Sequence, residues 1–359
     1  MQIVVGIIAL ALYGAVTFYI GWCLKRWLQA VKVYRWPVVY WSILFFISFS
    51  PMLAMPLEVL SFLRPVGYYW MFFLQYGLLV CLGAQLVMLV PKLRNVKVVG
   101  SVSVALIAVL FVAGLYFAYT PTVRELTIEI EKEGEPLRIV MASDFHLGAL
   151  SGKRHLARFV ELSNEVNPDL VLLSGDIIDD DPKWYIDENM QEEMLQLKST
   201  YGVYGALGNH EYYGGKMEEF LVEMEKSNVQ MLIDETVLIH DLFYLTGRED
   251  LTNEDRLALS ELKPEDLAKP WFVINHTPLD LPEMAKEKVD LMVFGHTHKG
   301  QLWPNKFITS LIYDLDYGHE MFDQMHAVVS SGFGFWGPPM RIGSQAELWV
   351  IDVQFKAPE

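Results

Sequence analysis

Four long runs without a charged side chain occupy the first third of the chain, and they constrain its fold more than any other feature. A transmembrane helix needs about 20 apolar residues to cross roughly 30 Å of hydrocarbon, and each run reaches that length. Helices buried in a soluble core rarely lack charge over such lengths, so we predict four transmembrane helices within residues 1–119. The runs are Met1–Leu24, Trp36–Leu57, Pro65–Pro91 and Val98–Val123.

Charge is divided unevenly between this segment and the rest of the chain. Residues 1–119 hold eight of the 28 Lys and Arg residues and one of the 44 Asp and Glu residues, which leaves a net charge of −23 on residues 120–359. So acidic a surface argues against a nucleic-acid partner, because phosphate backbones are bound through Lys and Arg. Two cysteines exclude a disulfide framework and a Cys-rich zinc site. We predict two domains, a membrane region at 1–119 and a globular domain at 120–359.

Basic residues in the short loops predict the orientation of the membrane region, because loops rich in Lys and Arg stay in the cytoplasm. The loops after the first and third runs hold seven basic residues, whereas those after the second and fourth hold one each. The first run also lacks the preceding basic residues of a cleaved signal peptide. We therefore expect a multi-pass cell-membrane protein with its N-terminus and residues 120–359 on the extracytoplasmic side.

Short apolar strands alternate with helical patterns after residue 120, which predicts an α/β layered domain. Strands are expected over 125–130, 138–142, 170–173, 203–207, 229–233, 237–246, 271–274, 291–294, 328–330 and 347–353. Helices are expected over 153–166, 186–197, 216–227 and most of 257–267.

Polar clusters directly follow five of these strands. Because ligands of α/β sheets bind beyond the carboxyl ends of the strands, we expect the clusters to meet at one rim. Imidazole mixed with carboxylate and amide oxygens suits Mn, Fe or Zn, and the ligands suffice for two ions. Strand residues two apart share a face, so Asp144 and His146 should point the same way, as should His296 and His298. The clusters are Asp144-Phe145-His146, Gly175-Asp176-Ile177-Ile178-Asp179, Gly208-Asn209-His210-Glu211, Asn275-His276 and Gly295-His296-Thr297-His298.

These clusters, in this order, resemble the calcineurin-like metallophosphoesterases, whose motifs are DxH, GDxxD, GNH[DE], a lone His and GHxH. The resemblance covers about residues 135–355 and implies a four-layer αββα sandwich. Segments 208–213, 295–304 and 330–341 are most similar to the YkuE/YaeI-like branch, and the apolar runs ahead resemble the transmembrane metallophosphoesterases. One departure is Lys299, where that branch usually carries glycine.

The resemblance also implies a role for each motif residue. Two divalent ions, Mn first and Fe or Zn as alternatives, would share Asp176, and a hydroxide held between them would be the nucleophile. His210 would contact a phosphoryl oxygen or protonate the leaving group, with Asp179 orienting it. One ion would be held by Asp144, His146 and His298, and the other by Asn209, His276 and His296.

Three further residues are candidates for contact with the substrate. Arg341 has a fork suited to phosphate, with a surface salt bridge as the alternative. Lys299 would add a cation beside the substrate or alter a tight turn, and Tyr212 would stack on the substrate or pack in the fold. Glu211 is either a residue of the site rim or an acid that stabilises the start of a helix.

We therefore expect a membrane-anchored, metal-dependent phosphoesterase that cleaves a phosphomonoester, phosphodiester or pyrophosphate. One helix anchors a protein effectively irreversibly, so four helices favour a lipid or lipid-linked substrate. The alternatives are a non-catalytic metal-binding membrane sensor or scaffold, and a transporter or channel with an appended phosphatase. The second alternative is disfavoured because the apolar runs contain no ionisable residue of the kind that marks ion pathways.

Overall fold

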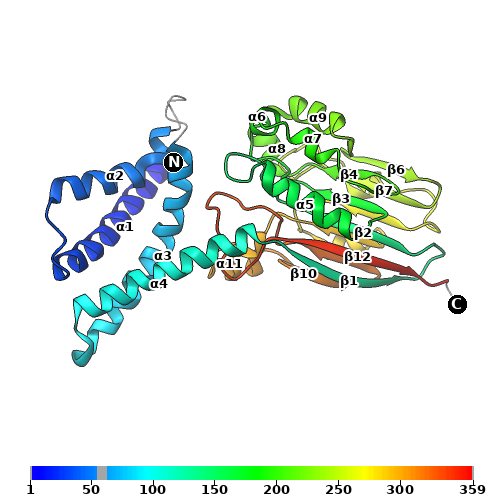
Figure 1. The fold of residues 1–359 in the computed structure, drawn as a ribbon. Coiled ribbons are helices and arrows are strands. Elements are labelled where there is room, and N and C mark those ends of the chain that lie inside the picture. The colour runs from blue at the N-terminus through cyan, green and yellow to red at the C-terminus, as the bar shows by residue number, and fades with distance from the viewer. Residues whose placement is uncertain (1, 55–62, 358–359) are drawn as a thin grey trace. The chain divides into compact units, whose positions relative to one another are not determined.

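The computed structural model describes residues 2–54 and 63–357, which divide into two compact units (Figure 1). The helical unit comprises Met1–Leu115 with Gly337–Met340, and the globular unit comprises Tyr116–Trp336 with Arg341–Glu359. The predicted domain boundary between residues 119 and 120 stays a prediction.

Four apolar helices, one for each predicted run, build the helical unit. By length and composition, α1, α3 and α4 can each cross a membrane, whereas α2 is shorter over its apolar part, Pro37–Leu53. Three of the four predicted spans are thus candidates among the described residues, and the crossing by α2 stays a prediction. Residues 55–57 of the second predicted run lie outside the described residues. The helices are α1 Gln2–Ala30, α2 Pro37–Ala54, α3 Arg64–Leu89 and α4 Val96–Tyr119, with the short turn η2 Pro91–Leu93 between the last two.

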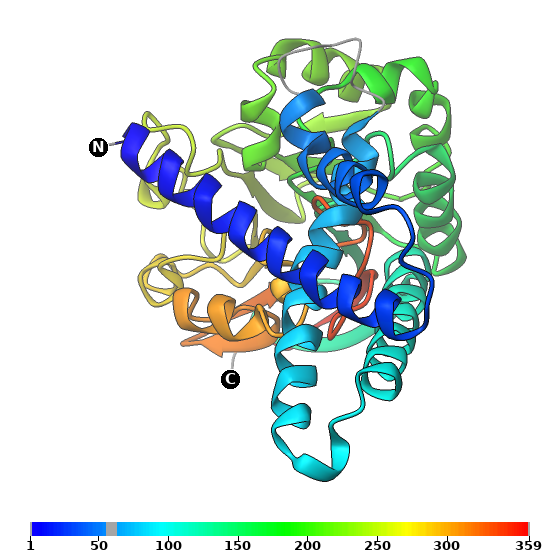
Figure 2. The same ribbon diagram turned by 90° about the vertical axis from the view of Figure 1, so that its left-hand side faces the viewer.

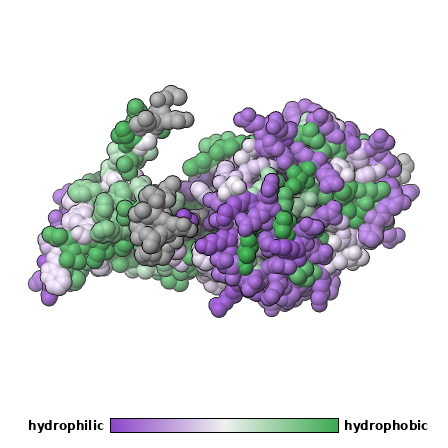
Figure 3. Space-filling view, turned by 90° about the horizontal axis from the view of Figure 1, so that it is seen from above, coloured by the Kyte–Doolittle hydropathy of each residue, from purple (hydrophilic) through white to green (hydrophobic). Residues whose placement is uncertain are grey.

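The outer surfaces of these helices are apolar, as contact with lipid requires. Val38 is 78% exposed and Leu89 is 67% exposed, and the space-filling view shows hydrophobic side chains over most of the helical unit (Figure 3). A helix that is hydrophobic all round is typical of a membrane span. Figure 2 shows α3 and α4 joined at one end by the short connection that contains η2.

Two six-stranded mixed sheets form the centre of the globular unit. The first has the order β1-β12-β2-β3-β4-β5, and β2 to β5 are parallel to one another. The second has the order β10-β11-β9-β8-β7-β6, and β7, β8, β9 and β11 are parallel. The strands are β1 Thr122–Ile130, β2 Leu137–Ala142, β3 Leu170–Ser174, β4 Val203–Ala206, β5 Val229–Met231, β6 Glu235–Ile239, β7 Phe243–Gly247, β8 Trp271–Ile274, β9 Leu291–Phe294, β10 Gly318–Phe322, β11 Met325–Val329 and β12 Glu347–Phe355.

Helices cover the outer faces of both sheets, which confirms the predicted four-layer αββα sandwich. Leu172 of the first sheet and Phe272 of the second belong to the apolar core between the sheets. Phe159 and Phe220 belong to the core under the helices of the first sheet, and Leu281 to that of the second. The helices and helical turns are α5 Lys153–Glu165, α6 Lys183–Asp187, α7 Met190–Met194, α8 Asn209–Tyr213, α9 Met217–Lys226, η3 Leu259–Glu261, α10 Leu281–Ala285, η4 His298–Gly300 and α11 Lys306–Ile312.

Three predicted elements of the globular unit were wrong, each for a local reason. The strand expected over 237–246 is the hairpin of β6 and β7, which turns at His240 and Asp241, both with positive φ. The helix expected over 186–197 is broken between α6 and α7 at Asn189, which also has positive φ. The helix expected over 257–267 is reduced to the single turn η3.

Candidate metal centre

Five loops at the carboxyl ends of strands bring the motif residues of both sheets to one place. The first sheet contributes the loops after β2, β3 and β4, and the second sheet contributes the loops after β8 and β9. The predicted ligands of these loops are Asp144, His146, Asp176, Asn209, His276, His296 and His298.

The first group of donor atoms comes from Asp144, His146 and His298. The Nε2 atoms of His146 and His298 lie 3.1 Å apart, and His298 Nε2 lies 3.4 Å from Asp144 Oδ1. All three side chains are buried. Three ligand atoms therefore converge on one small volume inside the protein.

The second group comes from Asn209, His276 and His296. Asn209 Oδ1 lies 2.9 Å from His296 Nδ1 and 3.2 Å from His276 Nε2, and these two nitrogens are 3.2 Å apart. His276 Nδ1 donates to the carbonyl of Ser174 at 2.8 Å, which fixes the ring so that Nε2 faces the group. The geometry matches the second predicted ligand set.

The carboxylate of Asp176 lies between the two groups. Its Oδ2 atom is 3.1 Å from His276 Nε2 and 3.7 Å from His146 Nε2, and the side chain is buried. The single Oδ2 atom thus faces a histidine of each group, while Oδ1 accepts the backbone N–H of His210.

The ionisation of the site fits bound cations. Burial lowers the pKa of His146 to about 3, that of His296 to about 4 and that of His298 well below its usual value. These three rings are therefore neutral. Burial also lowers the pKa of His276, but the carboxylates of Asp176 and Asp144 outweigh it and raise this pKa well above its usual value. Neutral imidazoles and buried carboxylates converging in this way are the donor set that a divalent transition metal prefers.

Residues with left-handed backbone conformation orient the ligand side chains, and the alternation of strand residues does not. The predicted reason for their alignment was therefore wrong. Strand β2 ends at Ala142, so Asp144 and His146 lie beyond it. Non-glycine residues rarely adopt positive φ, and such residues gather at functional sites. The ligands with positive φ are Asp144, His146, Asp176, His296 and His298.

Two motif glycines allow loops to approach the carboxylates closely. A Cβ at Gly208 would overlap Asp176 Oδ1, and one at Gly295 would overlap Asp144 Oδ2. The approach also provides hydrogen bonds, because the backbone N–H of His210 donates to Asp176 and that of His296 donates to Asp144. The glycines of the GNH and GHxH motifs thus serve to hold the acidic ligands.

Glu211 is a positioning residue whose importance the sequence did not reveal. It is buried and accepts hydrogen bonds from the backbone N–H groups of Asp176, Ile177, Ile178 and Gly208, at 2.7–3.2 Å. The bond to Gly208 supports the interpretation of a helix-start acid, at α8, and the burial rules out the site rim. Its carboxylate joins the loops that carry Asp176 and Asn209. The sequence feature that could have indicated this role is the glutamate at the end of the GNHE motif.

His210 is buried beside the first donor group, with its ring edge-to-face against that of His146. Its Nδ1 forms an ion pair with Asp180 Oδ1 at 2.7 Å, whereas Asp179 Oδ1 is 3.7 Å away. Both carboxylates are within ion-pair distance of the ring and Asp180 is the nearer, so the role of Asp179 in orienting His210 stays a prediction. Burial lowers the pKa of His210, but the carboxylates of Asp180, Asp176 and Asp179 outweigh it and raise this pKa to about 9.

Arg341 lies behind the site and has no surface exposure. Its guanidinium donates to the carbonyls of Ser331 and Gly334, at 2.6 and 2.7 Å, and faces His298 Nδ1 at 3.3 Å. The surface salt bridge is contradicted, and a role in binding substrate gains no support because the hydrogen-bond donors are engaged by the protein. Arg341 instead fixes the loop that packs against His298.

Lys299 and Tyr212 occupy structural positions outside the two donor groups. Lys299 has positive φ, as expected where the branch carries glycine, and its ammonium lies 3.7 Å from the ring centroid of Tyr317. Tyr212 is half-buried and packs against the core of the first sheet, which favours packing over stacking on substrate.

Comparisons with known proteins agree with this geometry. The model of the calcineurin-like phosphoesterase family matches residues 137–300, which contain all seven predicted ligands. An uncharacterized metallophosphoesterase of Aquifex aeolicus is 30% identical over 69% of this chain and 99% of its own length. An uncharacterized metallophosphoesterase of Campylobacter jejuni is 31% identical over 66% of this chain and 64% of its own length.

A transmembrane protein with a metallophosphoesterase domain from Danio rerio is 31% identical over 68% of this chain and 60% of its own length. The chain thus spans about three fifths of the length of several of these relatives. The YkuE/YaeI-like branch stays a prediction. The family match, the shared motifs and the apolar helices agree, and the chain belongs to the calcineurin-like metallophosphoesterase family.

Proposed function

We propose that this chain is a membrane-anchored phosphoesterase with a two-metal centre that hydrolyses a phosphoester or pyrophosphate of a lipid or lipid-linked substrate. The observation that carries the proposal is the pair of three-ligand groups with the Asp176 carboxylate between them. Two ions bound there supply an activated water and a clamp for the phosphoryl oxygens. Mixed imidazole, carboxylate and amide ligands favour Mn, with Fe or Zn as alternatives.

In this proposal His210 is the general acid. A group that protonates a leaving oxygen must carry a proton at working pH, and the ion pair with Asp180 favours the protonated ring. The ring lies edge-to-face against His146 and shares a further group of donor atoms with His146 and Asp179, so it is close enough to the first donor group to reach a bound substrate. Asp180 is then the positioning residue that holds Nδ1 and directs Nε2.

Helix α11 supports a substrate that is presented at the bilayer surface. None of its seven residues is buried, and Leu311 is 87% exposed. Exposed apolar patches on folded domains mark contacts with membranes or partners. The exposed apolar side chains of α11 are Phe307, Ile308, Leu311 and Ile312.

The place of α11 in the globular unit favours the membrane as its partner. The helix follows η4, which begins with the predicted ligand His298. Trp303 precedes α11 and packs against Gly343, and Gly343 lines a pocket together with Phe117 from the last turn of α4. The apolar helix thus lies near the point where a membrane-spanning helix joins the unit, and near the proposed reaction site.

Contacts within the helical unit support four crossings although α2 is short. The Tyr40 hydroxyl donates to the Gly21 carbonyl at 2.6 Å, and the Tyr13 hydroxyl donates to the Ser48 carbonyl. The start of α2 thus contacts the later part of α1, and the end of α2 contacts the earlier part, so the two helices are antiparallel. Its 18 residues extend about 27 Å, close to the roughly 30 Å of hydrocarbon. Four crossings, with the basic loops cytoplasmic, would place residues 120–359 on the extracytoplasmic side.

Replacing His210 with alanine distinguishes an enzyme from a metal-binding scaffold. We expect the full-length variant to keep two ions per chain, because no ligand is lost, and to turn over a bis-aryl phosphodiester about 10²–10⁴-fold more slowly. Metal content by mass spectrometry and initial rates in Mn measure the two effects. His319→Ala in β10 is the matched control and should behave as wild type. Two bound ions with no turnover of any phosphoester by the wild type would favour the scaffold.

Charges placed in α11 test presentation at the membrane. We expect Ile308→Glu with Leu311→Glu to lower turnover of a vesicle-borne lipid phosphate roughly tenfold or more, because burying such side chains is worth about 1.5–3 kcal/mol each. Turnover of a soluble diester should not change. Ser310→Glu, which adds charge at an exposed polar position of the same helix, is the control. Equal losses on both substrates, or none on the lipid, would contradict this part of the proposal.

A further inference from the structure

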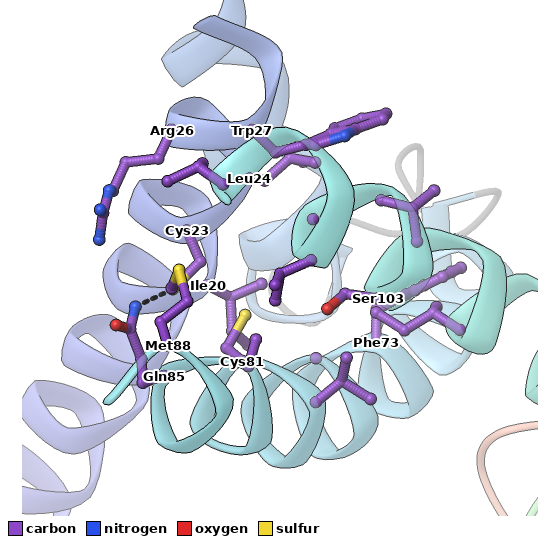
Figure 4. A pocket seen from close by; sticks show the side chains of 18 of the residues that line it. Ile20, Cys23, Leu24, Arg26, Trp27, Phe73, Cys81, Gln85, Met88 and Ser103 are labelled. Carbon is purple, nitrogen blue, oxygen red and sulfur yellow. Dashed lines mark hydrogen bonds between the residues drawn. The ribbon is translucent and has the colours of Figure 1, made fainter. Parts of the chain in front are cut away.

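A cavity of about 270 Å³ lies between α1, α3 and α4 of the helical unit (Figure 4). Its wall is predominantly apolar, with side chains such as Ile20, Leu24 and Phe73. An apolar cavity of about 150 Å³ already stays dry and accepts apolar ligands, so this one calls for an apolar occupant. In a helix bundle surrounded by lipid, that occupant is a hydrocarbon chain.

Gln85 and Cys23 form a polar pair in the apolar wall, which also contains Ser103 and Arg26. Gln85 Nε2 donates to Cys23 Sγ at 3.7 Å, and Figure 4 shows this pair joining α3 to α1. A primary amide has a second N–H, and inside a membrane a donor of this kind finds its partner on a neighbouring helix or on a bound molecule. The ester carbonyl of a lipid is the matching acceptor.

The cavity reaches the charged end of the bundle. Arg26 of α1, Met88 of α3 and Val96 of α4 all line it, so the ends of α1 and α3 and the start of α4 lie together. Arg26 stacks over the ring of Trp22, with 4.8 Å from its guanidinium carbon to the ring centroid. Lys25, Lys92, Arg94 and Lys97 lie in the same end segments.

Among the described residues of their unit, these cations have no acidic counterpart. The one acidic residue of segment 1–119 is Glu58, which lies outside the described residues, and residues 337–340 carry no charge. Arg94 is engaged by the carbonyls of Met88 and Leu89 at the end of α3, but those partners carry no full charge. A cluster of Lys and Arg at the end of membrane helices recognises anionic headgroups, at about 1 kcal/mol for each cation near the surface.

We propose that the cavity binds one phospholipid with an anionic headgroup. One acyl chain lies between α1, α3 and α4, the ester region faces Gln85, and the phosphate pairs with Arg26. This lipid is a bound ligand of the helical unit and not the substrate, so the inference does not depend on the proposed hydrolytic function.

Native mass spectrometry of the full-length protein with equimolar phosphatidylglycerol and phosphatidylcholine tests the headgroup. We expect one phosphatidylglycerol to remain bound per chain, and Arg26→Gln to lower the preference over phosphatidylcholine roughly fivefold. Arg35→Gln removes an exposed cation that does not line the cavity and should keep the preference. A wild type without preference, or equal effects of the two variants, would overturn the proposal.

A second variant tests the cavity itself. Ala84 lines it, so Ala84→Phe should fill the space and displace both lipids, whereas Ala105→Phe, on the exposed side of α4, should not. Helical circular dichroism and turnover of a soluble diester show whether each variant is folded. Equal lipid retention by the two folded phenylalanine variants would overturn the proposal, and Arg26→Gln decides the matter if Ala84→Phe does not fold.

Discussion

Replacing Asp176 with asparagine is expected to lower hydrolysis of a bis-aryl phosphodiester at least about 10³-fold, which corresponds to about 4 kcal/mol of transition-state stabilisation. Its Oδ2 atom lies within 3.7 Å of one histidine from each donor group. Asparagine keeps the shape but removes the charge and one of the two carboxylate oxygens. The rate measurement in Mn therefore reports directly on whether one carboxylate serves two ions.

Measuring the bound metal distinguishes the loss of a metal ligand from misfolding of the variant. We expect the Asp176→Asn chain to bind fewer than two ions while its far-ultraviolet circular dichroism matches wild type. Asp181→Asn, which changes an exposed carboxylate paired with Lys216, is the matched control and should keep both ions and the full rate. An Asp176→Asn protein with two ions and wild-type turnover would remove Asp176 from the centre.

Replacing Glu211 with glutamine is expected to destabilise the globular unit by about 3 kcal/mol, although the substitution is nearly isosteric. The buried carboxyl group accepts four backbone N–H groups, and leaving a buried donor without its partner costs about 1–3 kcal/mol. A glutamine would direct its own N–H groups at some of these donors. The melting temperature should fall roughly 6–12 °C, and metal affinity about 10–100-fold, because the Asp176 loop loses its support.

Glu219→Gln, at an exposed position of α9, is the control for the same chemical change and should melt like wild type. Identical melting temperatures for the two variants would show that the hydrogen bonds of Glu211 do not hold the loops. A destabilised Glu211→Gln chain with unchanged metal affinity would confine its role to folding.

The convergence of the ligands could be predicted because it follows from sheet topology. Parallel strands place their carboxyl ends at one edge, so residues after β2, β3, β4, β8 and β9 meet although they are far apart in sequence. The orientation of the side chains could not be predicted in the same way. It depends on positive φ at Asp144 and His146, which sequence patterns of alternation do not encode.

Residues other than the metal ligands were predicted less well, because their roles depend on burial and on contacts distant in sequence. Arg341 is 43 positions from His298 and Glu211 is 35 positions from Asp176, and in each case the structure supplies the partner. Asp180, which has positive φ, lies closer to His210 Nδ1 than the predicted Asp179 does. Short elements such as α11 were missed since one or two turns carry too little periodicity to detect.

Metal-dependent turnover by the purified full-length protein tests the central claim most directly. The protein is stripped with a chelator, titrated with Mn, and assayed on a bis-aryl phosphodiester while bound metal is counted. We predict no turnover without metal and full turnover at two ions per chain. The Asp176→Asn protein should neither bind two ions nor turn over the diester. Turnover that survives complete removal of metal, or that saturates at one ion per chain, would contradict the two-metal centre.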